Sequence, residues 1–380
     1  KYFPKARKVE GVMSTQSATA GIVVAGGGTA GHVFPAIAVM QGLVDAGVDR
    51  RRLHYMGAKR GVETWLIPQS GFDGTFVSVT GISRKLSLRA LKFVTQQFLA
   101  TMRSVTLFRR WNVRAVVSVG GYASLPAVIA AVVTRRPIIV VSYDRTPGRA
   151  SRLAARWSTV TLVAFEDSPL RRAVVAGAPL RRSILSVDRI VDSDGARQRL
   201  GVPDGRTLVV VMGGSLGSGI LNDAVHEFLE THSSRGDLAV LHVAGKQRVS
   251  GPSERRGDGS VWYRRSEFVE EAEDLYAAAD VFVGRGGAST VHEVAATGTP
   301  AVLVPWSGAS EDHQVANVRW LSDSGGAVLV PDNDVEELVA ALSALLDDEQ
   351  QRSAVGSRAR EIGEVHHSGE ISRQILDAIR

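Results

Sequence analysis

The chain has 380 residues, of which 44% are hydrophobic, and it contains no cysteine. This length suits two domains of about 150–200 residues, and the apolar fraction excludes a mainly disordered chain. The lack of cysteine excludes a disulfide scaffold, a thiolate zinc site and a cysteine nucleophile. No apolar run reaches the roughly 20 residues that a membrane-spanning helix needs.

The net charge of +6 is unevenly distributed along the chain. Residues 1–180 hold 25 Lys+Arg against 8 Asp+Glu, whereas residues 181–380 hold 20 against 31. Between Gly74 and Tyr143 there is no acidic residue and there are ten basic ones. The first half of the chain is therefore suited to an anionic partner.

The first half alternates short apolar runs with helical patterns, after an N-terminal tail at 1–20. Met13 opens a stretch typical of a natural start, so we expect residues 1–12 to be upstream sequence. The expected strands are 22–25, 53–56, 115–119, 137–141, 160–163 and 174–175. Continuous apolar strands between helices indicate a parallel sheet with both faces covered.

A basic amphipathic helix is expected at 87–110. Its apolar residues recur at helical spacing and basic residues surround them; the apolar ones are Leu88, Leu91, Val94, Phe98, Met102 and Val105. Such a helix either lies on an anionic membrane surface or packs as a surface helix with a solvated basic face. We expect no nucleic-acid partner, because no recognition motif accompanies the charge.

The pattern restarts after a polar stretch at 182–205, which we interpret as a linker with one short helix. The later strands are expected at 208–212, 239–243, 281–283, 301–304 and 327–330. We therefore predict an α/β chain of two doubly wound Rossmann-like domains, 21–180 and 181–360, with a cleft between them at the strand ends. A closing helix at 361–380 is a candidate to pack back on the first domain.

The first strand leads into a glycine-rich turn, Gly26-Gly27-Gly28-Thr29-Ala30-Gly31-His32, that opens a helix. Such a turn lets backbone amides approach an anion at a helix N-terminus. A dinucleotide site is disfavoured because the second strand ends in Gly57-Ala58-Lys59-Arg60, without an acid for the ribose. His32 is either a surface cap or a proton acceptor near neutral pH.

Two further glycine-rich segments follow strands in the second half. One is Gly213-Gly214-Ser215-Leu216-Gly217, and the other is Gly284 to Thr290 followed by His292-Glu293. A carboxylate such as Glu293 suits ribose hydroxyls, and amides such as Gln314 and Asn317 both donate to and accept from sugar hydroxyls.

Two acidic or histidine clusters are weak metal candidates. Asp192-Ser193-Asp194 lies among arginines in the polar stretch, and His366-His367 has no partners at ligand spacing, so we interpret the histidines as solvated. We expect no obligatory metal or other cofactor.

The order of these motifs resembles glycosyltransferase family 28 from about Gly21 to the end of the chain. The best-matching segments are 27–36, 120–126, 213–215 with Gly217, 285–293, and His313-Gln314 with Asn317. The resemblance implies a GT-B fold. It also implies inverting transfer of N-acetylglucosamine from UDP-N-acetylglucosamine to undecaprenyl-diphosphate-MurNAc-pentapeptide, lipid I to lipid II, in peptidoglycan synthesis at the cytoplasmic face of the cell membrane.

The resemblance also implies roles for individual residues. The donor would be bound by Thr29, Gly31, Arg181, Ser215, Phe268, Val269, Ala288, Ser289, Thr290, Glu293 and Gln314. The polyprenyl-diphosphate acceptor would face Gly28, Gly121 and Tyr122. The basic helix at 87–110 then corresponds to a membrane-docking surface, which makes the protein a peripheral one.

Several positions depart from the family pattern. The usual His-Glu-Gln-Asn is Val141-Ser142-Tyr143-Asp144 here, an asparagine has become Ala178, and a glutamine has become Leu216. Two alternatives therefore stay open: a divergent enzyme with another lipid or natural-product acceptor, and a non-catalytic UDP-sugar-binding paralogue.

The implied reaction needs a base for the acceptor hydroxyl. Backbone amides and arginine would neutralise the leaving diphosphate, where negative charge develops. His32 is the favoured base, and Asp144 is the alternative because a carboxylate is more basic than the amide that it replaces.

Overall fold

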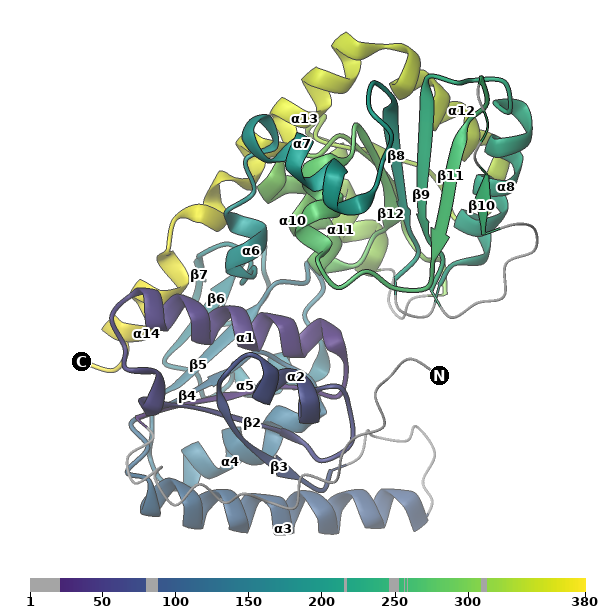
Figure 1. Ribbon diagram of the computed structural model, residues 1–380. Coiled ribbons are helices and arrows are strands. Elements are labelled where there is room, and N and C mark those ends of the chain that lie inside the picture. The colour runs from purple at the N-terminus through teal and green to yellow at the C-terminus, as the bar shows by residue number, and fades with distance from the viewer. Residues whose placement is uncertain are drawn as a thin grey trace. The chain divides into compact units, whose positions relative to one another are not determined.

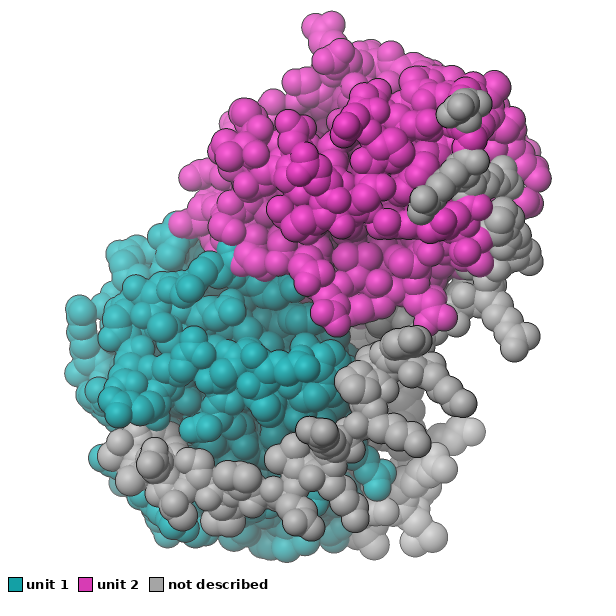
Figure 2. Space-filling model, viewed as in Figure 1, with its two compact units in different colours: residues 1–182, 368–380 teal, residues 183–367 magenta. Residues whose placement is uncertain are grey.

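The computed structural model describes residues 21–79, 88–214, 217–245, 253–255, 257, 259–308 and 313–380, with the backbone alone for 88–93 and 255. Contacts within the chain divide it into two units (Figure 2). Unit 1 comprises Lys1–Arg182 and Ser368–Arg380, and unit 2 comprises Ser183–His367.

Unit 1 is built on a seven-stranded sheet in the order β3-β2-β1-β4-β5-β6-β7, with every strand parallel to its neighbours. Its strands are β1 (Ile22–Ala25), β2 (Leu53–Ala58), β3 (Asp73–Val77), β4 (Ala115–Ser118), β5 (Ile138–Ser142), β6 (Val160–Val163) and β7 (Ala173–Val175). Sequence analysis missed β3, an edge strand whose residues are mostly half-buried or exposed and so lack a continuous apolar run.

Helices cover both faces of this sheet (Figure 1). They are α1 (Ala30–Asp45), α2 (Glu63–Gln69), α3 (Leu88–Arg110), α4 (Leu125–Val133), α5 (Arg149–Ala154) and α14 (Glu370–Asp377). Successive residues of β1 point to opposite faces: Ile22 and Val24 pack with α1 and α14, and Val23 and Ala25 pack with α3, α4 and α5. This alternation explains why the strand is apolar throughout.

Helix α3 buries a different face from the one that its apolar pattern suggested. The buried side chains are Gln97, Ala100, Thr101, Ser104, Val105 and Phe108. Three of the predicted apolar residues, Val94, Phe98 and Met102, are instead exposed by 42–62%. The side chains of Leu88 and Leu91 lie outside the described residues. The helix therefore packs through a face that combines small side chains with Gln97, Val105 and Phe108, and it leaves other apolar side chains in solvent.

Unit 2 repeats the architecture with a sheet in the order β10-β11-β9-β8-β12-β13-β14. Its strands are β8 (Thr207–Met212), β9 (Leu238–Val243), β10 (Glu254–Arg255), β11 (Trp262–Ser266), β12 (Val281–Arg285), β13 (Ala301–Val304) and β14 (Val328–Leu329). Only the β10–β11 pair is antiparallel among the described strands. β10 and β11 were not predicted from the sequence.

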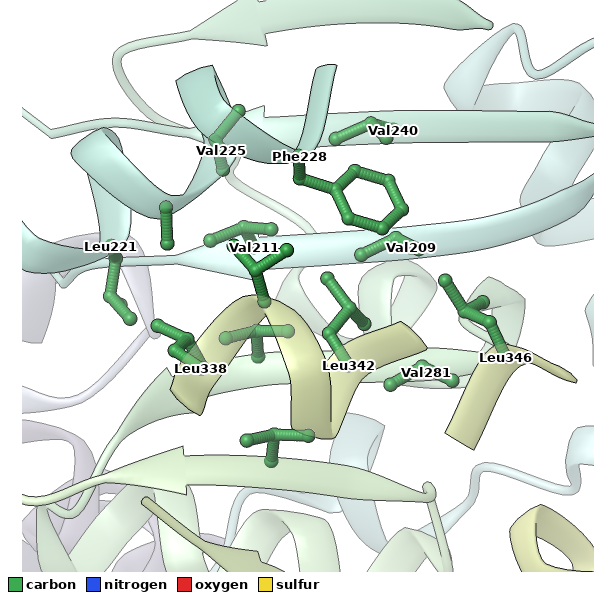
Figure 3. Close-up of a cluster of buried hydrophobic side chains, with 14 of the residues drawn as sticks. Val209, Val211, Leu221, Val225, Phe228, Val240, Val281, Leu338, Leu342 and Leu346 are labelled. Carbon is green, nitrogen blue, oxygen red and sulfur yellow. The ribbon is translucent and has the colours of Figure 1, made fainter. Parts of the chain in front are cut away.

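The helices of unit 2 are α6 (Arg182–Leu185, whose first residue belongs to unit 1), α7 (Arg189–Leu200), α8 (Gly219–Thr231), α9 (Ala272–Ala278), α10 (Ala288–Thr297), α11 (His313–Ser322), α12 (Val335–Asp347) and α13 (Glu349–Gly363). On one face of the sheet, Phe228 of α8 and Leu342 of α12 meet Val209 and Val211 of β8 (Figure 3). On another part of the sheet, the ring of Tyr276 of α9 lies 5.0 Å from that of Phe282.

Two segment predictions were wrong. The polar stretch at 182–205 is mostly helical, because Asp188 caps α7 by accepting the Ile190 amide and Gly201 ends the helix in a left-handed conformation. The predicted closing helix at 361–380 is broken: α13 ends at Gly363, the short helical turn η4 (Glu364–His367) follows, and α14 begins after Gly369 (φ +68°). A Cβ on Gly363 would lie 2.2 Å from the Ala295 carbonyl oxygen, so this end of α13 packs directly on α10.

Candidate functional site

In unit 1 the loops after β1, β2, β4 and β5 leave the carboxyl edge of one parallel sheet. They carry the glycine-rich turn 26–32, the segment 59–62, the turn 119–121 and the loop 143–148. Because neighbouring parallel strands end at the same edge, residues distant in sequence meet there. Seven of the predicted site residues lie on these segments or at the starts of the helices that follow: Gly28, Thr29, Gly31, His32, Gly121, Tyr122 and Asp144.

The two glycine turns of unit 1 pack directly against one another. Gly28 has a φ of +94°, and a Cβ there would lie 2.6 Å from Cε1 of Tyr122. Gly121 has a φ of +75°, and its Cβ would lie 2.3 Å from the carbonyl oxygen of Gly27. Only glycine fits either position, because both the backbone angle and the space forbid a side chain.

Glu63, which sequence analysis missed, lies fully buried beneath the first turn. Its Oε1 accepts hydrogen bonds from the Gly28 amide at 3.0 Å and from the Ala58 amide at 3.2 Å. A Cβ on Gly27 would lie 2.5 Å from the same oxygen, and Tyr55 donates to the Gly26 carbonyl. The signal available in the sequence was an acid at the first position of a helix, two residues after Gly61.

His32 lies in the first turn of α1, at the opening of the unit 1 site. Thr29 is the N-cap residue of α1, and its Oγ1 lies 3.0 Å from Nδ1 of His32. Burial lowers the pKa of His32 below its ordinary value, while the negative charge of Asp144 acts in the opposite direction. The imidazole is therefore neutral at neutral pH and able to accept a proton.

A cavity of about 360 Å³ adjoins His32 within unit 1. Its walls combine apolar side chains, among them Val119, Leu125 and Leu153, with the polar groups of Tyr143, Asp144 and Arg149. The buried Tyr143 hydroxyl donates to the carbonyl oxygen of Gly31, which ties the 143–148 loop to the start of α1. The four consecutive residues that depart from the family pattern, Val141, Ser142, Tyr143 and Asp144, all line this cavity.

Arg181 also belongs to unit 1, two residues before the boundary with unit 2. Its guanidinium lies over the ring of Phe34 of α1, 4.8 Å from the ring centroid. Within unit 1 the Arg181 side chain therefore packs against α1.

In unit 2 a glycine turn joins β8 to α8. A Cβ on Gly213 would lie 2.8 Å from the Ser218 amide nitrogen, and a Cβ on Gly245 would lie 2.3 Å from the Gly217 amide nitrogen. Ser218 caps α8 by accepting from the Leu221 amide. Ser215, the residue predicted to contact the donor diphosphate, lies outside the described residues, as does Leu216.

Helix α10 carries the residues predicted to hold the donor nucleoside. Its N-cap is Gly287, which makes no side-chain cap, and Ala288, Ser289 and Thr290 form its first turn. The N-terminus therefore offers backbone amides that no capping side chain accepts from. One turn on, Glu293 is half-buried and its Oε2 accepts a hydrogen bond from Tyr276 at 2.8 Å, which fixes the carboxylate.

Gln314 lies in the first turn of α11, after the carboxyl end of β13. Its Oε1 accepts from the Trp306 amide at 2.9 Å. A Cβ on Gly286 would lie 2.9 Å from the Gln314 carbonyl oxygen, so the loops after β12 and β13 are in contact. Trp306 was not predicted as a site residue.

Phe268 and Val269 follow β11 at the same edge of the unit 2 sheet. Phe268 is 62% exposed, and Val269 is half-buried. An aromatic ring left in solvent at the strand ends has the exposure that a stacking partner of a planar base requires.

The histidine pair at 366–367 is not solvated, which corrects the sequence interpretation. His366 is 6% exposed, and its Nε2 lies 3.2 Å from Nδ1 of the buried His292, while His367 contacts the Ala296 carbonyl. Together they fasten the turn η4 to α10. In the described part of the chain, no group of three or more His, Asp or Glu residues is placed to hold a metal ion.

Two family models match the chain, one for each half. The glycosyltransferase family 28 N-terminal domain matches residues 22–163, and the glycosyltransferase family 28 C-terminal domain matches residues 208–368. These matches confirm the family resemblance read from the motifs.

Curated relatives align over nearly the whole chain. A Shewanella halifaxensis protein is 33% identical over 357 residues, covering 92% of this chain and 94% of its own length. A Desulfitobacterium hafniense protein is 30% identical over 368 residues, covering 94% and 98%. Both are named UDP-N-acetylglucosamine--N-acetylmuramyl-(pentapeptide) pyrophosphoryl-undecaprenol N-acetylglucosamine transferase.

Solved structures share the fold. The crystal structure of MurG from Acinetobacter baumannii has a TM-score of 0.67 at 24% identity, covering 94% of this chain and 98% of that one. A UDP-GlcNAc 2-epimerase from Neisseria meningitidis bound to UDP-GlcNAc has a TM-score of 0.64 at 12% identity, with coverage of 94% and 98%. The predicted fold, two Rossmann-like domains of the GT-B type, is confirmed.

We predict that Glu63→Ala destabilises the chain by about 2–6 kcal/mol, because the amides of Gly28 and Ala58 lose their acceptor at about 1–3 kcal/mol each. Glu63→Gln keeps an acceptor oxygen and should lose much less. Urea unfolding of the two variants checks this. Equal losses for Ala and Gln would show that the hydrogen bonds to Gly28 and Ala58 are not what Glu63 contributes.

Proposed function

Because the chain belongs to glycosyltransferase family 28, we propose that it transfers N-acetylglucosamine from UDP-N-acetylglucosamine to undecaprenyl-diphosphate-MurNAc-pentapeptide, with inversion at the anomeric carbon. The observation that carries the proposal is the 33% identity, over 92% of the chain, to a relative named for this reaction. The described residues of both units are compatible with it.

Unit 2 supplies the donor site in this proposal. The free amides of the first turn of α10 face the uridine nucleotide, and Glu293, held by Tyr276, accepts from the two ribose hydroxyls. The exposed ring of Phe268, with Val269, flanks the uracil. Since Oε1 of Gln314 is occupied by the Trp306 amide, its NH₂ group is the part left to donate to the sugar hydroxyls.

Unit 1 supplies the acceptor site. The cavity beside His32 and the two glycine turns receive the acceptor sugar and its diphosphate, with Arg149 as a positive charge in the cavity wall. The amide of Gly28 already donates to Glu63, so Gly28 contributes space rather than a hydrogen bond. Tyr122 closes the wall above Gly28.

The reaction is a direct displacement at the anomeric carbon. The acceptor hydroxyl attacks from the side opposite to UDP, the carbon–oxygen bond to UDP breaks, and the hydroxyl proton passes to His32. The neutral state of His32 follows from its burial. Its contact with Thr29 at Nδ1 leaves Nε2 to face the substrate.

The altered loop supports a second candidate, a family 28 enzyme with another lipid-linked acceptor. Ser142, Tyr143 and Asp144 line the cavity in which the acceptor sugar would sit, and Tyr143 fixes the loop through Gly31. A change at the four positions Val141 to Asp144 in a cavity wall alters which acceptor fits, and leaves the residues assigned to the donor in unit 2 unchanged.

The two candidates are separated by UDP release from UDP-N-acetylglucosamine with and without lipid I. Release that depends on lipid I supports the proposed reaction. Donor binding with release only on another polyprenyl-diphosphate sugar supports the second candidate. Donor binding without release on any acceptor would identify a non-catalytic sugar-nucleotide-binding protein.

We further propose peripheral attachment to the anionic cytoplasmic face of the cell membrane through α3 and α4. Exposed apolar side chains lie on both helices, which contact each other: Val94, Phe98, Leu99 and Met102 on α3, and Ile129, Val132 and Val133 on α4. Arg103, Arg109, Arg110 and Arg135 are exposed on or beside them. No helix within the described ranges is long and apolar enough to cross a bilayer.

We predict that His32→Ala reduces turnover about 10²–10⁴-fold, because it removes the general base. Lipid I-dependent UDP release under saturating donor measures it, and an unchanged affinity for UDP-N-acetylglucosamine serves as the control. Turnover near that of the unaltered chain would transfer the role of base to Asp144.

We predict that Asp144→Asn shifts the acidic limb of the kcat/KM profile to lower pH. The base acts as neutral imidazole, so activity falls as the pH drops through the pKa of His32. Asp144 raises that pKa, so its neutralisation lowers the pKa. An abolished rate at every pH would instead make Asp144 the base, and an unmoved limb would exclude electrostatic coupling between the two.

We predict that Phe98→Ser with Leu99→Ser weakens binding to vesicles containing anionic lipid about 10²–10⁴-fold, since each apolar side chain buried in the membrane contributes about 1.5–3 kcal/mol and every 1.4 kcal/mol is about tenfold. Ile190→Ser with Val191→Ser is the matched control, because these residues of α7 are 96% and 74% exposed in unit 2. Vesicle co-sedimentation measures both, and equal losses for the two pairs would contradict a defined docking surface.

A further inference from the structure

The turn after β13 is held more firmly than a surface turn requires. The Trp306 amide donates to Gln314, and the amide and hydroxyl of Ser307 both donate to Oδ2 of Asp332 at 2.9 Å. Asp332 is itself paired with Arg285, the last residue of β12, and the side chains of both are largely buried. Side chains from three separate segments of unit 2, the end of β12, the start of α11 and the loop after β14, therefore hold the backbone of Trp306 and Ser307.

The indole of Trp306 is nevertheless 51% exposed. Its ring lies against the backbone of Gly308, where a Cβ would stand 2.8 Å from Cε2 and Cζ2 and 3.0 Å from Nε1. Glycine at 308 lets the ring lie close to the backbone. A large aromatic group is thus kept in a defined orientation with about half of its surface in solvent.

The location of this ring is specific. Its own amide is bound by the side chain predicted to recognise the sugar hydroxyls, Gln314. A Cβ on Gly286, in the turn that opens α10, would lie 3.2 Å from Cα of Pro305. The backbone that carries the ring therefore lies beside both the side-chain amide predicted for the sugar and the helix end predicted for the nucleotide.

We propose that Trp306 is a specificity-determining residue that stacks on the apolar face of the donor hexose, an assignment that rests on the proposed function. A pyranose presents C–H groups on one face and hydroxyls around its edge. The indole of Trp306 covers the C–H face, while the NH₂ group of Gln314 binds the hydroxyls. Together Trp306 and Gln314 distinguish a sugar nucleotide from the free nucleotide. A turn fixed by Asp332 limits the entropy lost when the sugar binds.

Calorimetric titration of UDP and of UDP-N-acetylglucosamine into the full chain tests this. Trp306→Ala should weaken UDP-N-acetylglucosamine about 3–10-fold and leave UDP unchanged, and Trp306→Phe, which keeps a ring, should retain most of the affinity. Trp157→Ala, which removes a 46% exposed tryptophan of unit 1, should change neither. Glu293→Ala should weaken both ligands by the same factor, because both contain ribose.

The outcomes separate the inference from the function that it rests on. A wild-type chain that binds neither ligand overturns both. A wild-type preference for UDP-N-acetylglucosamine over UDP that survives in Trp306→Ala overturns the stacking alone. If Trp306→Ala and Trp306→Phe each reduced the affinity for UDP and for UDP-N-acetylglucosamine by the same factor, Trp306 would maintain the shape of the turn and would not stack on the sugar. If Trp306→Ala lost binding to anionic vesicles while its affinity for UDP-N-acetylglucosamine stayed unchanged, Trp306 would be a membrane contact and not a sugar contact.

Discussion

In each unit the parallel strands end at a common edge, and the candidate site of each unit depends on that constraint. A parallel ladder returns the chain to the same side of the sheet after each helix, so successive loops meet although tens of residues separate them. The glycine turn after β1 meets the turn after β4, and the loop after β12 meets the loop after β13. Short loops then suffice to build a site.

Close approach between these loops depends on backbone rather than on side chains. Gly28 and Gly121 leave room for Tyr122 and for the Gly27 carbonyl, and Gly245 does the same for the turn before α8. Where backbone segments pack this closely, their buried N–H groups still need hydrogen-bond acceptors, and buried carboxylate side chains supply them. Glu63 accepts the amides of Gly28 and Ala58 in unit 1, and Asp332 accepts from Ser307 in unit 2.

The two units share this architecture and present different chemical groups. Unit 1 holds a neutral histidine beside a largely apolar cavity and carries exposed apolar side chains and arginines on α3 and α4. Unit 2 presents an uncapped helix end, a carboxylate and exposed aromatic rings. The charge asymmetry follows this division, since the acid-free segment from Gly74 to Tyr143 lies wholly in unit 1. A basic unit suits an anionic lipid carrier.

The sequence by itself determined the fold class, the family and most of the strands. Buried parallel strands are apolar throughout, and the closely packed turns accept few residues other than glycine. Strand β3 and the break after Gly363 were missed, since an edge strand lacks that signal and a helix end set by packing on Ala295 leaves no local pattern. Only the tertiary structure revealed Glu63 beneath Gly28, the buried His292–His366 pair and the fixed turn under Trp306. Each depends on a contact between residues far apart in sequence, whose energy arises from burial and pairing that no local pattern encodes.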